Sequence, residues 1–114
     1  MAMTYVCSPL SAATRTAMLT NAAKAMSYMA MAEHEFGERA VAPHAYLPYL
    51  LDDRIPAERA LALEFGQKLL ALCSWLVVYG VRVSDGMQKE IAMAQQLGIP
   101  VFYRDDAGGL RDAM

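Results

Sequence analysis

Short apolar runs alternate with longer amphipathic stretches along this chain. Strands are predicted at 4–7, 39–43, 75–79 and 99–103, where apolar runs end at Pro, Gly or polar residues. Helices are predicted at 16–36, 56–73 and 85–97, where apolar residues recur every three or four positions. Strands that alternate with helices of this length favour a parallel sheet covered by helices on both faces.

These elements predict a small, doubly wound (flavodoxin- or Rossmann-like) α/β domain with about four strands and three helices. If the first strand lies centrally, right-handed crossovers give the strand order 2-1-3-4. The chain then reverses direction between the first and third strands. The crevice at that point would receive Ser8 from one side and residues 80–90 from the other.

Two of the predicted helices carry distinctive apolar residues. The methionines of the first helix, among them Met18, Met26 and Met29, are expected to fill the core rather than to bind a cofactor. The second helix begins at Pro56, which suits a first helical turn. Its amphipathic pattern is formed by Leu61, Leu63, Phe65, Leu69, Leu70 and Leu72.

Composition narrows the class of protein. The 114 residues suffice for one small domain, taken here as 1–114, and the net charge of -2 argues against nucleic acid as a partner. The start lacks a basic segment, and the longest apolar run, near 69–81, is too short to span a bilayer. We therefore expect a cytoplasmic protein that does not bind membranes. A hydrophobic content of 56% favours a homo-oligomer, a dimer or larger.

The cysteines and histidines favour neither a disulfide framework nor a metal centre. Cys7 and Cys73 lie in apolar runs and are interpreted as small, reduced core residues. His34 and His44 are the two histidines, and neither lies in a ligand-spaced cluster with the cysteines. We expect no metal and no cofactor.

The segment 84–94 combines a polar turn, a glycine and one isolated acid at the start of an apolar helix. Glu90 could act as nucleophile or base at the sheet edge, or could be a surface glutamate beside Lys89. Ser84 is expected to cap the helix in either case. Gly86 would allow a ligand to approach the backbone, or would serve only the turn.

Other candidates flank the same edge. Ser8 opens the loop between the first strand and helix, where backbone N–H groups can hold an anion, although no glycine-rich phosphate motif is present. His44 could contact a base or phosphate, or could be a structural histidine. Tyr5 offers a flat, hydrogen-bonding surface that core packing would explain equally well.

Several short motifs resemble those of the nucleoside 2-deoxyribosyltransferase superfamily, in particular its small phage and bacterial branch of uncharacterised domains. The resemblance spans nearly the whole chain and is most specific in the last motif. It rests on Tyr5 to Leu10, Asn21, Ala42-Pro43-His44, Leu51-Asp52-Asp53 with Pro56, Glu58 and Arg59, and Tyr79-Gly80 leading to Ser84, Gly86, Met87, Glu90, Ile91 and Ala94.

The resemblance implies that Glu90 attacks the anomeric carbon of a 2-deoxyribosyl group and forms a covalent glycosyl-enzyme. Asp53, or alternatively Asp52, would protonate the leaving base, and Tyr5 would orient the nucleophile. Ser84 matches the serine of the related deoxynucleotide N-hydrolases, which suits a 5'-phosphate. The residues expected to bind substrate are Ser8, Pro9, Leu10, His44, Gly80, Ser84, Gly86 and Met87.

The function that follows is exchange or hydrolysis of the base of a deoxynucleoside or its 5'-monophosphate. In the family a neighbouring subunit completes the site. An alternative is a protein that senses or sequesters a nucleotide in the same crevice without turnover. The resemblance does not specify the base, or whether water or a second base resolves the intermediate.

Overall fold

The computed structural model describes residues 3–10, 12–47, 50–52, 54–80 and 82–111. No helix within these ranges is long and apolar enough to cross a membrane. The elements, in chain order, are β1 (Met3–Cys7), α1 (Arg15–Phe36), β2 (Arg39–Val41), the 3-10 helix η1 (Pro43–Ala45), α2 (Pro56–Leu70), β3 (Trp75–Tyr79), α3 (Asp85–Gln96) and β4 (Val101–Arg104).

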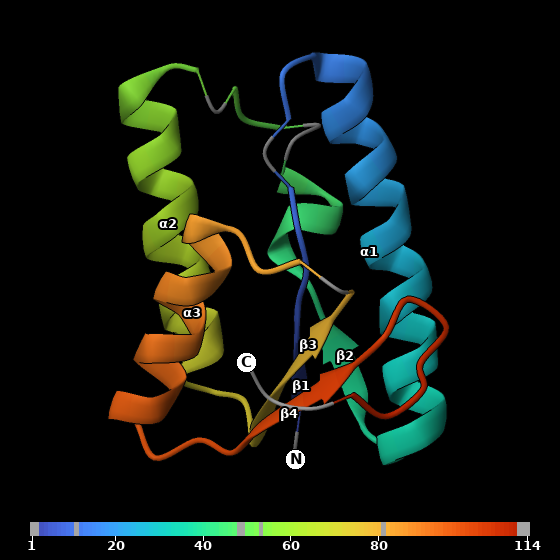
Figure 1. Ribbon diagram of the computed structural model, residues 1–114. Helices are drawn as coiled ribbons and strands as arrows, with labels where there is room; N and C mark the ends of the chain where they lie inside the picture. Colours follow the sequence, from blue (N-terminus) through green and yellow to red (C-terminus); the bar gives the residue numbers. More distant parts are fainter. Residues whose placement is uncertain (1–2, 11, 48–49, 53, 81, 112–114) are drawn as a thin grey trace.

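The strands form one parallel sheet in the order β2-β1-β3-β4, which confirms the predicted α/β fold and strand order (Figure 1). In the register of the sheet, Tyr5 of β1 pairs with Val41 of β2 and with Leu76 of β3. Strands are added on one side of β1 and then on the other, so the topological switch point falls between β1 and β3. Ligands of such sheets bind outside the carboxyl ends of the strands at this point.

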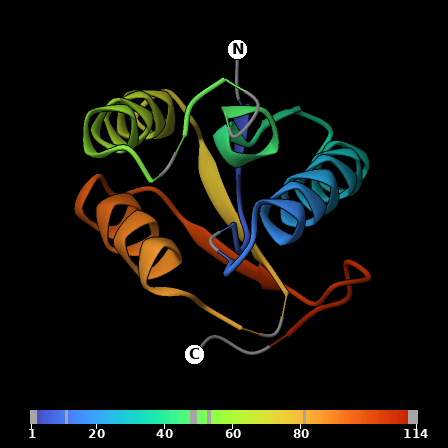
Figure 2. The ribbon, with the colours of Figure 1, turned by 90° about the horizontal axis from the view of Figure 1, so that it is seen from above.

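Successive side chains along each strand point to opposite faces of the sheet, so the molecule has two hydrophobic cores. α1 covers one face of the sheet, and α2 and α3 cover the other (Figure 2). The α1 face buries Val6, Ala25, Tyr28, Ala32, Ala40, Ala42, Ala45, Val77 and Tyr79. The α2 and α3 face buries Tyr5, Cys7, Leu70, Cys73, Leu76, Val78, Met87 and Ala94. Tyr5 and Cys7, two residues apart on β1, thus point to the same face.

Small residues bring α1 close to the sheet. The helix begins after Thr14, whose hydroxyl accepts a hydrogen bond from the Ala17 N–H at 3.1 Å, and it ends at Gly37 in the left-handed conformation. The buried positions of α1 are Ala22, Ala25, Tyr28 and Ala32. The expectation that methionines fill this core is wrong for Met26, which is 62% exposed. Alanines allow the close approach, and the Tyr28 ring stacks on Tyr79 at 4.8 Å.

Only some of the apolar residues predicted to form the buried face of the second helix are buried. α2 ends at Leu70, its one fully buried residue, whereas Leu61 is 55% and Phe65 is 45% exposed. These side chains lie on the outer face, because the inner face carries the small and polar residues described below. The homo-oligomer stays a prediction that this surface supports, and sedimentation of the purified protein tests it.

The segment after the second strand differs from the predicted one. β2 ends at Val41 rather than at 43, because Pro43 begins the short helix η1. The proline lacks the N–H that a continuing strand would use. β4 similarly begins at Val101, one residue after Pro100, and not at 99. Both changes shorten strands without altering the topology.

Candidate active site

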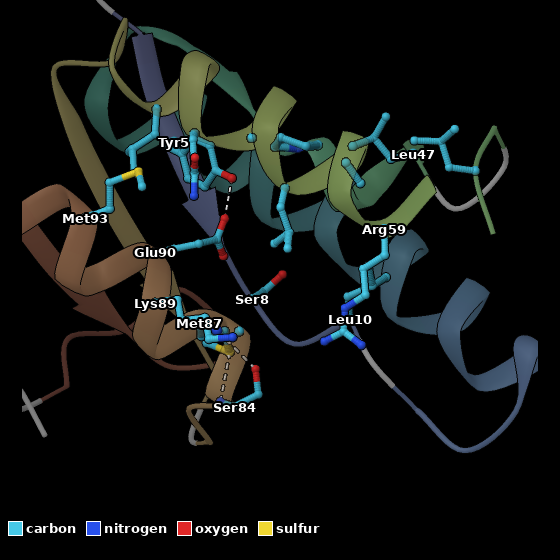
Figure 3. Close-up of a pocket in the computed structure, with 18 of the residues that line it drawn as sticks. Tyr5, Ser8, Leu10, Leu47, Arg59, Ser84, Met87, Lys89, Glu90 and Met93 are labelled. Atoms are coloured by element: carbon cyan, nitrogen blue, oxygen red, sulfur yellow. Dashed lines mark hydrogen bonds between the residues drawn. The ribbon is translucent and has the colours of Figure 1, made fainter. Parts of the chain in front are cut away.

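A cavity of about 390 Å³ lies beside the carboxyl end of β1, between α2 and α3 (Figure 3). This volume is within the range of small-molecule sites. Most of its wall is apolar. The lining residues are Tyr5, Ser8, Leu10, Met18, Pro43, Leu47, Leu51, Glu58, Arg59, Ala62, Leu63, Gly66, Gln67, Leu70, Ser84, Gly86, Met87, Lys89, Glu90 and Met93.

The carboxylate of Glu90 is held by two side chains of the neighbouring strand. The Tyr5 hydroxyl donates a hydrogen bond to Oε2 of Glu90, and the Cys7 thiol lies 3.6 Å from Oε1. Figure 3 shows the Tyr5 and Glu90 side chains pointing toward one another at the wall of the cavity. Because β1 lies centrally in the sheet, both donors are fixed by a rigid element. Glu90 is therefore no surface glutamate paired to Lys89.

Burial controls the protonation of this cluster. It raises the pKa of Glu90 to about 7, although the hydrogen bonds from Tyr5 and Cys7 act in the opposite direction. Burial and the adjacent carboxylate raise the pKa of Tyr5 and of Cys7 well above their usual ranges. Tyr5 and Cys7 consequently stay protonated and serve as donors at neutral pH. Glu90 changes its charge near neutrality.

The first turn of α3 positions Glu90 relative to the cavity. The Ser84 hydroxyl accepts a hydrogen bond from the Met87 N–H at 3.3 Å, and the Ser84 N–H donates to the Met87 sulfur at 3.4 Å. This reciprocal arrangement fixes the helix start, as a capping box does. Gly86 lines the cavity, and a side chain added there would meet nothing within 4 Å, so close packing does not require this glycine.

The structure brings together Tyr5, Ser8, Leu10, Ser84, Gly86, Met87 and Glu90 among the predicted site residues. Pro9 and Gly80 do not line the cavity. Gly80 has a φ of 97°, and an added Cβ would come within 3.2 Å of Asp106 Oδ1. It therefore serves a turn that packs against the loop containing Asp106.

Three other predicted residues belong to the connection that precedes α2. Asp53 lies outside the described residues. His44 lies in η1, next to the cavity residue Pro43. Asp52 forms a salt bridge with Arg54 at 3.0 Å, and the hydrogen bonds from Arg54 lower the pKa of Asp52 to about 2. Asp52 is thus ionised at neutral pH and poorly suited to protonate a leaving group.

The polar part of the lining comes mainly from the two helices. α2 contributes Glu58, Arg59 and Gln67, and α3 contributes Lys89. Glu58 accepts a hydrogen bond from the Asp52 N–H at 2.8 Å. Within the described part of the chain, no group of three or more His, Cys, Asp or Glu side chains is placed to hold a metal ion.

A family model supplies the first comparison with known proteins. The family described as "Domain of unknown function (DUF7768)" matches residues 2–104, a span that runs from β1 to β4. The chain belongs to this family. Among curated proteins, none matches the sequence.

Solved structures relate the DUF7768 fold to an enzyme. A structure of a 2-deoxyribosyltransferase from Bacillus psychrosaccharolyticus superposes with a TM-score of 0.66 at 17% identity. The alignment covers 97% of this chain and 77% of that chain. At this identity the likeness establishes a shared fold. It agrees with the fold that the sequence motifs implied.

Two residues that lie beside the Tyr5–Glu90 pair in this DUF7768 chain were not singled out as site residues from the sequence. Gly66, in the interior of α2, lies where an added Cβ would be 3.3 Å from the Tyr5 hydroxyl. A glycine inside a helix is costly, so its presence was a usable signal of close packing. Cys7 was interpreted only as a core residue. Its place two residues after Tyr5 indicates that both side chains point to the same face of the sheet, but does not indicate that Glu90 lies there.

Replacing Gly66 by Ala tests this close packing. Alanine normally stabilises a helix interior by about 1 kcal/mol relative to glycine. At Gly66 we expect a smaller gain or a loss in the free energy of unfolding, because the Tyr5 hydroxyl is held by Glu90 and must give way. Gly86→Ala, which meets open space, is the control and should stabilise α3. Denaturant unfolding measures both, and a full gain at Gly66 would contradict the packing.

Proposed function

We propose that this protein is a nucleoside or nucleotide 2-deoxyribosyltransferase or N-glycosidase, which cleaves or exchanges the base through Glu90. The observation that carries the proposal is the carboxylate of Glu90, held by Tyr5 and Cys7 at a cavity beside the sheet switch point. The motifs that resemble the small phage and bacterial branch support the same assignment. The shared fold with a 2-deoxyribosyltransferase is consistent with it.

The chemistry requires a carboxylate aimed at the anomeric carbon. One oxygen of Glu90 bonds to C1' while the bond from C1' to the base nitrogen breaks, and its electron pair passes to the base. A second base or water then attacks C1', loses a proton, and releases Glu90 as a carboxylate. Positive charge that develops on the sugar favours the ionised form of Glu90 in the transition state.

The leaving base needs a proton as the bond breaks. On the basis of the resemblance, we propose Asp53 for this role. The alternative is Glu58 of α2, whose carboxyl group lines the cavity. Both precede β3 in the chain. Asp53→Asn and Glu58→Gln distinguish these two residues. With a common nucleobase as leaving group, the variant that lacks the acid should release the base far more slowly than the other variant.

The substrate would lie along the apolar wall with its sugar near Glu90. Ser8 and Ser84 line the cavity with Arg59 and Lys89, which favours a deoxynucleoside 5'-monophosphate over an uncharged deoxynucleoside. Ser84 brings no charge that would repel a phosphate. Competition between the two substrates in one assay tests this preference, and faster turnover of the unphosphorylated form would contradict it.

Chromatography tests the proposed function. Each common deoxynucleoside and deoxynucleoside 5'-monophosphate is incubated with the protein, with and without a second free base. Release of base indicates hydrolysis, and formation of a new nucleoside indicates transfer. The absence of both products with every substrate, at protein concentrations near that of the substrate, would refute the enzyme.

Turnover should depend on the ionisation of Glu90. Because its pKa is raised to about 7, the fraction of nucleophilic carboxylate falls as the pH drops below neutrality. We expect kcat/KM to fall about tenfold per pH unit between pH values of about 6 and 5. A pH profile measures this. An acid limb that is flat down to about pH 5 would contradict the assignment of Glu90.

A nucleotide-binding protein without turnover is the second candidate. It is favoured by one observation: Glu58, the second carboxyl group of the described cavity lining, already accepts a hydrogen bond from the Asp52 N–H. A site without a free acid would retain a nucleotide without releasing its base. Calorimetry that shows saturable binding of a nucleotide, with unchanged ligand recovered afterwards, would distinguish this candidate from the enzyme.

A further inference from the structure

We propose that Cys7 is a positioning residue for Glu90, whose thiol donates a hydrogen bond to the nucleophile. This inference rests on the proposed function for its catalytic meaning and on the geometry for its contact. The Cys7 sulfur lies 3.6 Å from Glu90 Oε1, and the Tyr5 hydroxyl takes the other oxygen, Oε2. The two oxygens of one carboxylate are thus fixed separately by two side chains of β1.

The thiol acts as a donor and not as a nucleophile. Cys7 is completely buried, and burial beside a carboxylate raises the pKa of its thiol well above the usual range. The S–H proton is therefore retained at neutral pH. A buried thiol of this kind is inert toward the substrate but can orient a neighbouring acceptor.

The same sulfur faces a second acceptor on α3. The Met87 carbonyl oxygen lies 3.9 Å from the Cys7 sulfur, one helical turn before Glu90. A thiol has one proton, so it donates to one oxygen at a time. It serves the Glu90 carboxylate while that group is charged, and turns to the Met87 carbonyl when Glu90 is protonated or bonded to sugar. Cys7 therefore stabilises the ionised nucleophile and the leaving carboxylate in the second step.

The cavity beside the Glu90 carboxylate also holds other titratable or charged groups. Tyr5 contributes the stronger donor from β1. Glu58 and Arg59 of α2 and Lys89 of α3 line the same cavity. Cys7→Ala replaces none of these residues, and the Cys7 sulfur that it removes is not exposed to solvent.

The experiment measures the pKa of Glu90 directly by carbon NMR of labelled glutamate carboxyl groups. Loss of the signal in Glu90→Gln assigns it. We expect Cys7→Ala to raise the pKa of Glu90 by about half a unit to one unit, since one weak hydrogen bond to the charged form is lost. Cys7→Ser, which keeps a hydroxyl donor, should leave the pKa close to the original value.

Cys73→Ala is the matched control. Cys73 is the other buried, free cysteine on the same side of the sheet, and its thiol contacts the Leu69 carbonyl at 3.4 Å rather than Glu90. The pKa of Glu90 should not change in this variant. If Cys7→Ala proves unstable, Cys7→Val fills the space without a donor and should raise the pKa in the same way. An unchanged pKa in both variants, or equal shifts in Cys7→Ser and Cys7→Ala, would overturn the proposal.

Turnover provides a separate readout. The acid limb of the kcat/KM profile should move to higher pH in Cys7→Ala by the same shift as the NMR titration, and return in Cys7→Ser. If the unaltered protein shows no turnover, the proposed function fails while the NMR titration still decides the contact. If turnover is present and the titration is unmoved, Cys7 fails while the function stands.

Discussion

Replacing Glu90 by Gln is expected to lower base release or exchange by at least about a thousandfold. The amide keeps the size of the side chain and an oxygen that can accept from Tyr5, but it cannot form the bond to C1'. Binding should be retained, because the apolar wall and the charged groups of the cavity are unchanged. Single-turnover chromatography and calorimetry on the same sample separate the two effects.

Glu64→Gln is the control for that experiment. Glu64 lies on α2, its side chain is 61% exposed, and it pairs with Lys68 one turn later. The same chemical change at this surface position should leave turnover within about twofold, because exposed ion pairs contribute little. Equal activity of Glu90→Gln and Glu64→Gln would remove Glu90 from the mechanism.

Glu90→Gln is also expected to stabilise the protein at alkaline pH. The pKa of Glu90 is raised from 4.5 to about 7 in the folded state by burial. Between these values the folded chain holds a proton that the unfolded chain releases, so the free energy of unfolding falls as the pH rises. The loss reaches about 3 kcal/mol above a pH of about 7. Glutamine does not titrate and escapes this loss.

Urea unfolding at pH values of about 5 and 8 measures this effect. The difference in stability between Glu90→Gln and the unaltered protein should grow toward alkaline pH by roughly 2.5 kcal/mol over this range. Glu64→Gln, subject to the same buffers, should show nearly no such growth. A difference for Glu90→Gln that is the same at both pH values would show that the carboxylate is not desolvated in the fold.

The topology was predictable because each element carried a local signal. The 75–79 strand is bounded by Ser74 and Gly80 and matches β3 at both ends. Which face of the second helix points into the molecule was harder to predict from the sequence. Its leucines and Phe65 follow no single helical face, and the pattern cannot indicate that the cavity replaces part of the core on the inner side.

The site was predictable where one motif supplies several groups. Ser84, Gly86, Met87 and Glu90 share the first turns of α3, so their proximity follows from the helix itself. The role of Cys7 depends on the position of α3 relative to β1, which is fixed by long-range packing. The spacing of residues along one strand does not reveal it.

Gly80 is a predicted site residue that does not line the cavity. It belongs to the same sequence motif as Glu90, but its positive φ directs it toward Asp106 and the C-terminal loop. A glycine in a motif can serve the backbone alone. The conformation of the turn, which the sequence does not specify, decided which of its residues reach the cavity.

The most direct test of Glu90 as nucleophile is the mass of the intact protein during turnover. A deoxynucleoside analogue with fluorine at the sugar 2' position slows breakdown of the intermediate, because fluorine disfavours positive charge on the sugar. We predict a mass increase equal to one fluorinated sugar, mapped by peptide fragmentation to Glu90 and absent in Glu90→Gln. Release of base with no adduct, or an adduct on another residue, would contradict the account.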